Sequence, residues 1–187
     1  ADRMRILLEQ RVHAAGRLLR LVSIQAGVNP AVDVYAKSQK QVAVSLGIDY
    51  QSHILDPQSS PEAFCAFVDR FNRDPLVHGI IVQLPLPAQL KSHEVSRCIA
   101  PEKDCEGMHP VNMGKLLRRA AAGEEGLVPC TAAAAMELIN ASGVHLAGKE
   151  AVIVGHSPIV GKPLALMLMD KLATVTVCHI GTSQAGK

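Results

Sequence analysis

The sequence predicts an α/β protein in which helices cover a parallel sheet, because helical and strand-like segments alternate along its 187 residues. Hydrophobic residues make up 48% of the chain and aromatic residues only 3%, so aliphatic side chains must build the core. This composition suits layers of helix and sheet better than an aromatic-rich β-sandwich. The formal net charge is +2 and no basic run occurs, so we expect no nucleic-acid surface. No apolar stretch approaches the ~20 residues that cross a bilayer, so we expect no membrane insertion.

The N-terminal part of the chain alternates helix and strand patterns. We expect helices over residues 2–19, 32–46, 61–72 and 93–99, and strands over 21–25, 50–55 and 79–84. Ser60 is suited to the N-cap of a helix and Pro61 to its first position, while Gly47 favours a helix end. Strands that are connected through helices pair in parallel. The region therefore predicts a parallel sheet covered by helices.

A second unit is expected after Ala120–Gly126, a stretch of small residues that we interpret as a linker. We place the domain boundary between residues 122 and 123. Beyond it, Thr131 is expected to cap a helix over 132–140. Strands over 151–154 and 174–178 are expected to flank a helix over 163–172.

One polar side chain, Gln83, interrupts the apolar run Gly79–Leu84. An unpaired buried amide costs about 1–3 kcal/mol, so Gln83 needs either a hydrogen-bonding neighbour or a ligand. Pro85 and Pro87 end the strand, and open α/β sheets bind ligands at the carboxyl edge of their strands. From the residues alone, a loop carbonyl and a substrate are equally compatible partners.

The segment Glu150–Pro163 runs from a strand through Gly155 to Gly161 at the start of a helix. Such a layout lets backbone N–H groups approach a phosphate at a helix N-terminus. The spacing departs from G-x-G-x-x-G, because Ser157 takes the second glycine's place and the last glycine comes one residue later. A dinucleotide site and an ordinary strand–helix turn both remain open. The segment Cys178–Thr182 holds neither an acid nor an arginine, so the choice between NAD and NADP is also open.

The cysteines indicate a reducing compartment, the cytosol or the mitochondrial matrix, rather than a disulfide framework. Their number is odd and no CxxC pair occurs. We expect each to behave as a small buried hydrophobe. They are Cys65, Cys98, Cys105, Cys130 and Cys178. The eight histidines show no HxxxH or HxH spacing, so no metal site is predicted.

Several motifs occur in a fixed order over nearly the whole chain. They are PAVDVYAKSQK (Pro30–Lys40), GIIVQLPLP (Gly79–Pro87), PEKDCEGMHPVNMGKL (Pro101–Leu116), PCT (Pro129–Thr131), LAGKEAVIVGHSPIVGKPLALML (Leu146–Leu168) and ATVTVCH (Ala173–His179). Together they resemble the methylenetetrahydrofolate dehydrogenase/cyclohydrolase family. The resemblance implies a folate-binding catalytic domain over 1–122 and the beginning of a Rossmann-like NAD(P)-binding domain over 123–187. It also implies a cleft between the domains and a homodimer, and a typical member is longer than this chain.

The family carries out two steps on a tetrahydrofolate derivative. Its dehydrogenase step moves a hydride from methylenetetrahydrofolate to NAD(P), and its cyclohydrolase step opens the methenyl ring to 10-formyltetrahydrofolate. By resemblance, Tyr35 stacks on the folate, position 39 transfers protons, Gln83 positions that residue and Glu106 holds the pterin. The implied substrate-binding residues are Tyr35, Val82, Gln83, Leu84 and Glu106. The implied cofactor-binding residues are Gly155, His156, Ser157, Ile159, Val160, Gly161, His179 and Ile180.

The sequence departs from the family pattern at functional positions. Gln39 replaces the expected lysine and Glu106 an aspartate, while His156 replaces an arginine and Ile180 a polar residue. A glutamine amide has no titratable proton near neutral pH, so it cannot act as a general acid or base. We therefore expect the dehydrogenase step to persist and the cyclohydrolase step to be lost or severely weakened. The alternative is a catalytically silent homologue that binds folate or a protein partner.

Two nearby lysines are not expected to replace the missing one. Lys40 points about 100° round the helix from position 39, and Lys37 lies two residues from Tyr35 on the wrong face. We interpret both as solvated helix charges.

Overall fold

The computed structural model describes residues 2–122 and 126–183. The chain forms two compact units, which divide between Asp104 and Cys105. This division lies before helix α5 (Pro110–Ala122), whereas the boundary expected at 122/123 places that helix in the first domain. The position of the boundary between the two functional domains therefore stays a prediction. Part of the expected linker, residues 123–125, lies outside the described residues.

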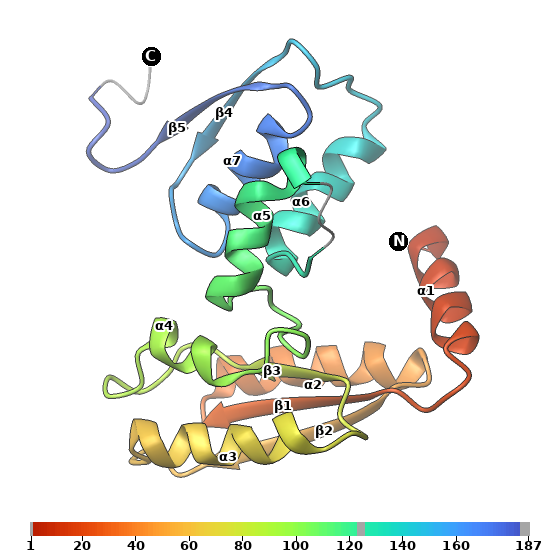
Figure 1. The fold of residues 1–187 in the computed structure, drawn as a ribbon, viewed down its shortest axis with the longest axis vertical. Helices are drawn as coiled ribbons and strands as arrows, with labels where there is room; N and C mark the ends of the chain where they lie inside the picture. Colours follow the sequence, from red (N-terminus) through yellow and green to blue (C-terminus); the bar gives the residue numbers. More distant parts are fainter. Residues whose placement is uncertain (1, 123–125, 184–187) are drawn as a thin grey trace. The chain divides into compact units, whose positions relative to one another are not determined.

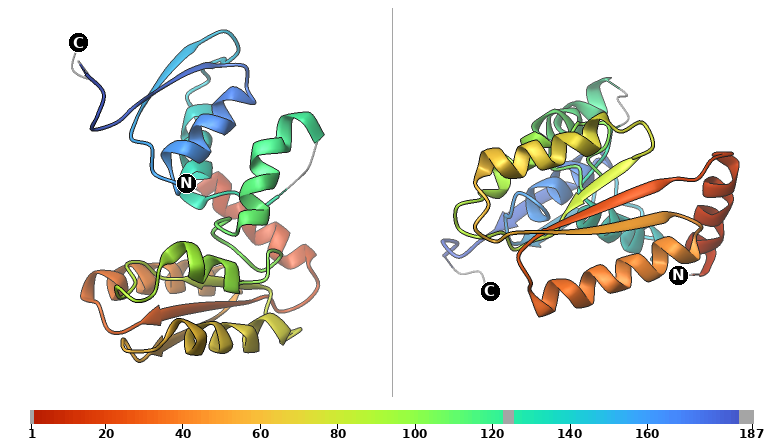
Figure 2. Two further views of the ribbon diagram at one scale, coloured as in Figure 1. Left: turned by 60° about the vertical axis from the view of Figure 1, so that its left-hand side comes forward. Right: turned by 90° about the horizontal axis from the view of Figure 1, so that it is seen from below.

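The first unit is a parallel three-stranded sheet with a helix on each face (Figures 1 and 2). Its elements are α1 (Asp2–Ala14), β1 (Arg20–Ala26), α2 (Pro30–Ser45), β2 (Asp49–Leu55), α3 (Pro61–Arg73), β3 (Gly79–Val82), α4 (Ser92–Val95) and the 3-10 helix η1 (Ser96–Cys98). The strand order is β2-β1-β3, and β1 pairs in parallel with both neighbours. The predicted α/β class and parallel sheet are confirmed.

The two covering helices start where their capping residues dictate. Asn29 caps α2, because its side chain accepts hydrogen bonds from the backbone N–H groups of Ala31 and Val32 at 3.0 and 3.4 Å. Ser60 caps α3 by accepting from the N–H of Ala63 at 3.2 Å, and Pro61 takes the first helical position as predicted.

The register of the sheet separates an apolar face from a polar one. Ser23 of β1 lies opposite Ser52 of β2 and Ile81 of β3. Val22 and Ile24 therefore face α3, where they join a core that includes Phe64. The opposite face, under α2, carries polar side chains from all three strand segments. These are Ser23, Gln25, Tyr50, Ser52 and Gln83.

Some element ends differ from the prediction. Helix α1 ends at Ala14 instead of residue 19, because Gly16 adopts a positive φ of 63° that a right-handed helix cannot contain. Strand β3 ends at Val82, two residues early, and the Leu84–Pro85 peptide bond is cis. The helix expected over 93–99 is the short α4 followed by η1. None of the described helices is both long and apolar enough to cross a membrane.

The second unit packs helices against a parallel strand pair. After α5 come α6 (Cys130–Ala141), β4 (Glu150–Val154), α7 (Gly161–Met169) and β5 (Thr174–Cys178). Met136, Ile153 and Leu168 form its core. Helix α5 was not predicted. Thr131 does not cap α6, because the helix begins at Cys130, two residues earlier than expected, and Pro129 occupies the N-cap without a side-chain bond.

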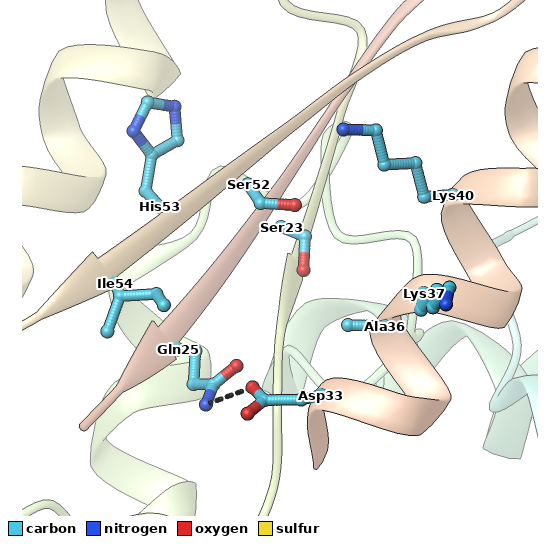
Figure 3. Close-up of a pocket in the computed structure, with 9 residues that line it drawn as sticks. All are labelled: Ser23, Gln25, Asp33, Ala36, Lys37, Lys40, Ser52, His53 and Ile54. Carbon is cyan, nitrogen blue, oxygen red and sulfur yellow. Dashed lines mark hydrogen bonds between the residues drawn. The ribbon is translucent and has the colours of Figure 1, made fainter. Parts of the chain in front are cut away.

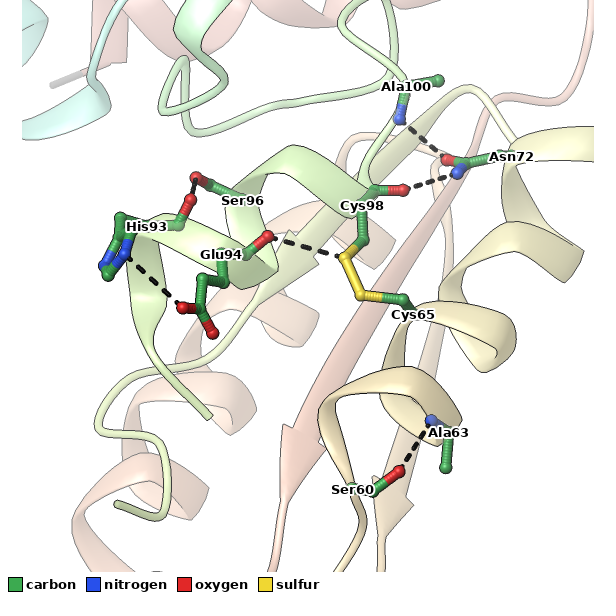
Figure 4. Close-up of a disulfide and its surroundings, with 9 residues drawn as sticks. All are labelled: Ser60, Ala63, Cys65, Asn72, His93, Glu94, Ser96, Cys98 and Ala100. Carbon is green, nitrogen blue, oxygen red and sulfur yellow. Dashed lines mark hydrogen bonds and ion pairs between the residues drawn. A yellow bond between two sulfur atoms is a disulfide. The ribbon is translucent and has the colours of Figure 1, made fainter. Parts of the chain in front are cut away.

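A disulfide joins Cys65 on α3 to Cys98 in η1, with their Cα atoms 5.3 Å apart (Figure 4). The prediction that each cysteine is a small buried hydrophobe is therefore wrong for this pair, and it is wrong for the exposed Cys130. The side chain of Asn72 holds the same segment: its Nδ2 donates to the carbonyl of Cys98 at 2.7 Å, and its Oδ1 accepts from the N–H of Ala100 at 2.9 Å. Chain segments that are far apart in sequence meet here, so the residues alone gave no indication of the pairing.

Candidate active site

Gln83 and Gln39, two of the predicted site residues, are in direct contact. Gln83 lies just beyond β3 and is buried, and its backbone N–H donates to the carbonyl of Ile24 at 2.8 Å. Its side-chain Nε2 donates to Oε1 of Gln39 at 2.7 Å and to Oγ of Ser23 at 2.9 Å. The polar side chain in the apolar strand is thus satisfied by two neighbours from α2 and β1, and neither is a loop carbonyl.

Tyr50 of β2 joins this network, although the sequence did not single it out. Its side chain is buried, and its hydroxyl donates to Oε1 of Gln39 at 3.2 Å. Burial raises the pKa of Tyr50, and the nearby Tyr35 raises it further, while hydrogen bonds with Ser23 and Gln83 lower it. The phenol therefore holds its proton at neutral pH. The one signal available in the sequence was an aromatic residue in a chain that contains few.

Of the other predicted substrate-binding residues of the first unit, Tyr35 lies on the helix that carries Gln39, whereas Val82 turns its side chain to the opposite face of the sheet. Tyr35, on α2 one helical turn before Gln39, is 59% exposed, so its ring is available for stacking on a flat ligand. Val82 is buried at the end of β3 with its side chain in the apolar core. Leu84 is exposed where the chain leaves the sheet.

Glu106 belongs to the second unit. It lies in the turn that precedes α5, and its side chain is partly exposed. Gly107, the next residue, has a φ of +64°, and a Cβ there would meet the backbone of Val128 and Pro129 at 2.5–2.8 Å. Close backbone packing therefore fixes the turn that carries Glu106.

The glycine-containing loop of the second unit is tightly closed. Gly155 has a φ of +120°, and a Cβ on Gly161 would collide with the carbonyl oxygen of Gly155. Ser157, in the place of a second glycine, caps the loop: its Oγ accepts a hydrogen bond from the N–H of Val160 at 3.1 Å. The strand, loop and helix therefore have the close approach that a dinucleotide phosphate requires.

The remaining predicted cofactor residues lie at the carboxyl ends of β4 and β5 and along the loop. The rings of His156 and His179 meet edge to face with centroids 4.8 Å apart. Ile180 is fully exposed. Ile159 is exposed and Val160 partly buried before the first turn of α7. The two histidines and Ser157 are polar side chains that lie at this end of the strand pair.

A pocket of about 220 Å³ lies between α2 and the polar face of the sheet (Figure 3). Its lining residues are Ser23, Gln25, Asp33, Ala36, Lys37, Lys40, Ser52, His53 and Ile54. In Figure 3 the Gln25 side chain points toward Asp33, and its Nε2 donates to Oδ1 of Asp33 at 3.1 Å. Sequence reasoning did not identify this pocket. The signal that could have found it is the alternation of serine and glutamine with valine and isoleucine along β1.

Two family models match the chain. Residues 1–106 match the model described as tetrahydrofolate dehydrogenase/cyclohydrolase, catalytic domain. Residues 129–187 match the NAD(P)-binding domain of the same family. The expectation of an NAD(P)-binding domain in the second part of the chain is therefore confirmed.

Individual relatives agree with these matches. "Bifunctional protein FolD 2" of Desulfitobacterium hafniense is 43% identical over 167 residues, which cover 89% of this chain and 57% of the relative. The crystal structure of the FolD methylenetetrahydrofolate dehydrogenase/cyclohydrolase of Campylobacter jejuni matches with a TM-score of 0.91 at 36% identity, covering 98% of this chain and 65% of that chain. The structure of the Trypanosoma brucei FolD, complexed with NADP and an inhibitor, matches with a TM-score of 0.88 at 34% identity. The match covers 97% of this chain and 62% of that chain.

This chain spans less than two thirds of the length of these relatives. The two family-model matches nevertheless take in both compact units, and the fold agrees with that of the solved relatives over nearly every residue. The chain belongs to the tetrahydrofolate dehydrogenase/cyclohydrolase family.

Proposed function

We propose that the protein oxidises 5,10-methylenetetrahydrofolate to 5,10-methenyltetrahydrofolate and passes the hydride to NAD or NADP. The hydrolysis of the methenyl ring to 10-formyltetrahydrofolate is lost or severely weakened. One observation carries the proposal: the residue that accepts the hydrogen bond from Gln83, at 2.7 Å, is Gln39, where the family resemblance implies a lysine. The relatives whose names state both activities support the substrate and the reaction class.

The two steps place different demands on position 39. Hydride transfer moves a hydrogen with its electron pair from carbon to the nicotinamide, so it depends chiefly on how the two partners are oriented. The hydrolysis adds water to the methenyl carbon, so a proton must leave that water and another must reach a ring nitrogen. A glutamine amide can do neither, and loss of such a proton carrier costs about 10²–10⁴-fold in rate.

The loop between β4 and α7 fits a dinucleotide. Its backbone can approach a phosphate closely, because no Cβ fits at Gly161 and Gly155 adopts a left-handed φ. The bound nicotinamide would supply the hydride acceptor. The residues proposed to hold the cofactor are Gly155, His156, Ser157, Ile159, Val160, Gly161, His179 and Ile180. His156 can donate one hydrogen bond to a phosphate, where an arginine would offer a paired fork.

The decisive assay gives the intact protein methylenetetrahydrofolate with NAD or NADP and follows the absorbance of the methenyl product. We expect turnover with at least one of the two cofactors. Folate binding without turnover under either condition would instead identify a catalytically silent homologue.

A second assay follows the hydrolysis of methenyltetrahydrofolate. We expect the Gln39→Lys, Glu106→Asp double variant to hydrolyse it about 10²-fold or more faster than the wild type. Gln41→Lys adds the same charge to an exposed position of the same helix and should leave the rate unchanged. An unchanged rate in the double variant would show that the loss arises elsewhere.

The protein is further proposed to be a homodimer in a reducing compartment, the cytosol or the mitochondrial matrix. The proposed partner is a small molecule, the tetrahydrofolate substrate. We propose no nucleic-acid partner, because the net charge is only +2 and no basic run occurs. In such a compartment Cys65 and Cys98 would be a dithiol. Light scattering of the purified protein tests the dimer, and the mass after alkylation without reductant tests the thiols.

A further inference from the structure

The amide oxygen of Gln39 accepts two hydrogen bonds. One comes from Nε2 of Gln83 at 2.7 Å and the other from the hydroxyl of Tyr50 at 3.2 Å. The two donors lie on the same face of the sheet and come from the segments on either side of β1, since β2 carries Tyr50 and Gln83 follows β3. Tyr50 is only 5% exposed and Gln83 only 4%, so neither donor can easily turn to water instead.

These two bonds determine which end of the Gln39 amide faces outward. A carboxamide has an accepting oxygen at one end and a donating NH₂ at the other. If the amide of Gln39 were reversed, its NH₂ would meet the NH₂ of Gln83, whose other N–H is engaged by Ser23. None of the described residues accepts a hydrogen bond from Nε2 of Gln39. The NH₂ group of Gln39 is therefore available to donate a hydrogen bond to a ligand.

We propose that Tyr50 is a positioning residue that, together with Gln83, orients Gln39 so that its NH₂ donates a hydrogen bond to an acceptor atom of the folate. This inference rests on the proposed function and adds a role for position 39: a fixed hydrogen-bond donor in place of a proton carrier. Neither the family resemblance nor the family matches assigns a role to Tyr50.

The chemistry of the phenol suits this task. A tyrosine hydroxyl is a donor only while it is protonated, and burial raises the pKa of Tyr50. The hydroxyl therefore remains a donor through the neutral and mildly alkaline range. The ring is held by the strand and the hydroxyl by Gln39, so the removal of the oxygen alone separates the hydrogen bond from the packing of the ring.

The test uses the intact protein and a double-mutant cycle of Tyr50→Phe and Gln39→Met, with KM and kcat measured for methylenetetrahydrofolate oxidation. Tyr50→Phe should raise KM about 3- to 10-fold, the worth of one hydrogen bond, and change kcat less. In the Gln39→Met background the same change should have no further effect on KM. Ser45→Ala, which removes an exposed hydroxyl that bonds the carbonyl of Val42 at the C-terminal end of α2, should leave KM unchanged.

A second variant keeps the test independent of the folding of Tyr50→Phe. Gln39→Glu retains an oxygen for both donors but has no NH₂, so it should unfold at a temperature close to that of the wild type while KM rises at least as much as in Gln39→Met.

Three results would overturn the inference while the proposed function stands. The first is a wild-type KM in Tyr50→Phe, and the second is a wild-type KM in Gln39→Glu. The third is that Tyr50→Phe raises KM by the same factor in the Gln39→Met background as in the wild type. A wild-type protein that does not oxidise the substrate would overturn the proposed function, and this inference with it.

Discussion

The ammonium group of Lys103 donates a hydrogen bond to the carbonyl oxygen of Asn72 at 2.7 Å. It also reaches the carbonyls of Phe71 and Asp74 at 2.9 and 2.8 Å, so it caps the C-terminal end of α3. A cation at this end of a helix satisfies orphan carbonyls and complements the helix dipole. Lys103 belongs to the PEKDCEG motif, and its contacts tie the start of that motif to α3 of the first unit.

Lys103→Met should lower the free energy of unfolding by about 2–3 kcal/mol, because charge-assisted hydrogen bonds in a partly buried position are lost together. Urea unfolding measures the change. Lys91→Met is the matched control, since Lys91 is exposed and its ammonium group forms a surface ion pair with Glu94 at 3.6 Å. Equal effects of the two variants would contradict the capping role.

Breaking the Cys65–Cys98 disulfide should destabilise the oxidised protein. The bond closes a loop with a sequence separation of 33, for which loop-closure entropy gives about 3–4 kcal/mol. Cys98→Ser and treatment with a reductant should have equal effects on urea unfolding, and they should not add. Cys178→Ser, outside the disulfide, is the control. Identical stability with and without reductant would mean that the bond is absent in solution.

His53 should make the protein less stable as the pH falls below about 6.5. Its ring packs against Phe67 and Phe71 with centroids 5.8 and 4.8 Å away, and burial, with a smaller contribution from Arg70, lowers the pKa of the imidazole. Between the lowered pKa and 6.5 the unfolded chain binds a proton that the folded state does not, so stability rises with pH in this window.

His53→Leu should flatten that part of the stability profile, and Arg70→Met should make it shallower because it removes the repelling charge. Chemical unfolding at a series of pH values between about 5 and 7.5 provides the measurement. A wild-type slope in His53→Leu would assign the pH dependence to other groups.

Gly161→Ala should damage the second unit, because the added methyl group would collide with the carbonyl oxygen of Gly155. We expect a loss of about 1–3 kcal/mol of stability and weaker binding of NAD or NADP by calorimetry. Gly114→Ala is the matched control, and its effect on stability should have the opposite sign. Gly114 lies in α5 with open space around it, so the alanine should stabilise the helix by about 0.5–1 kcal/mol. If both variants bound the cofactor equally, the close approach of the two glycines would be irrelevant to binding.

Local chemistry explains which elements could be predicted. Ser60 and Pro61 mark the start of α3 by themselves, because a cap and a fixed φ act within a few residues. Helix α5 also begins with a proline, Pro110, but the residue before it is a histidine rather than a usual capping residue, and Gly114 lowers the helix propensity, so the pattern did not predict a helix. The disulfide depends on α3 meeting η1, a contact that no local pattern encodes.

The site was predictable in the same partial way. A lone amide in an apolar strand predicts that Gln83 needs a partner, but its partners lie 60 and 44 residues away in the chain. They become neighbours only through the parallel register of β1 and the packing of α2. Tyr50 could not have been found without this register, since nothing in its own segment distinguishes it from a core aromatic residue.

The register of the sheet also constrains how such a site can change. A shift of one residue between β1 and β3 would turn Gln83 away from Gln39 and bury its amide beside Phe64. An insertion or deletion in these strands would therefore disturb the site, whereas a substitution on the helix above them leaves the register unchanged. Under the proposed function, position 39 holds a fixed hydrogen-bond donor instead of a proton carrier, while its place in the fold stays the same.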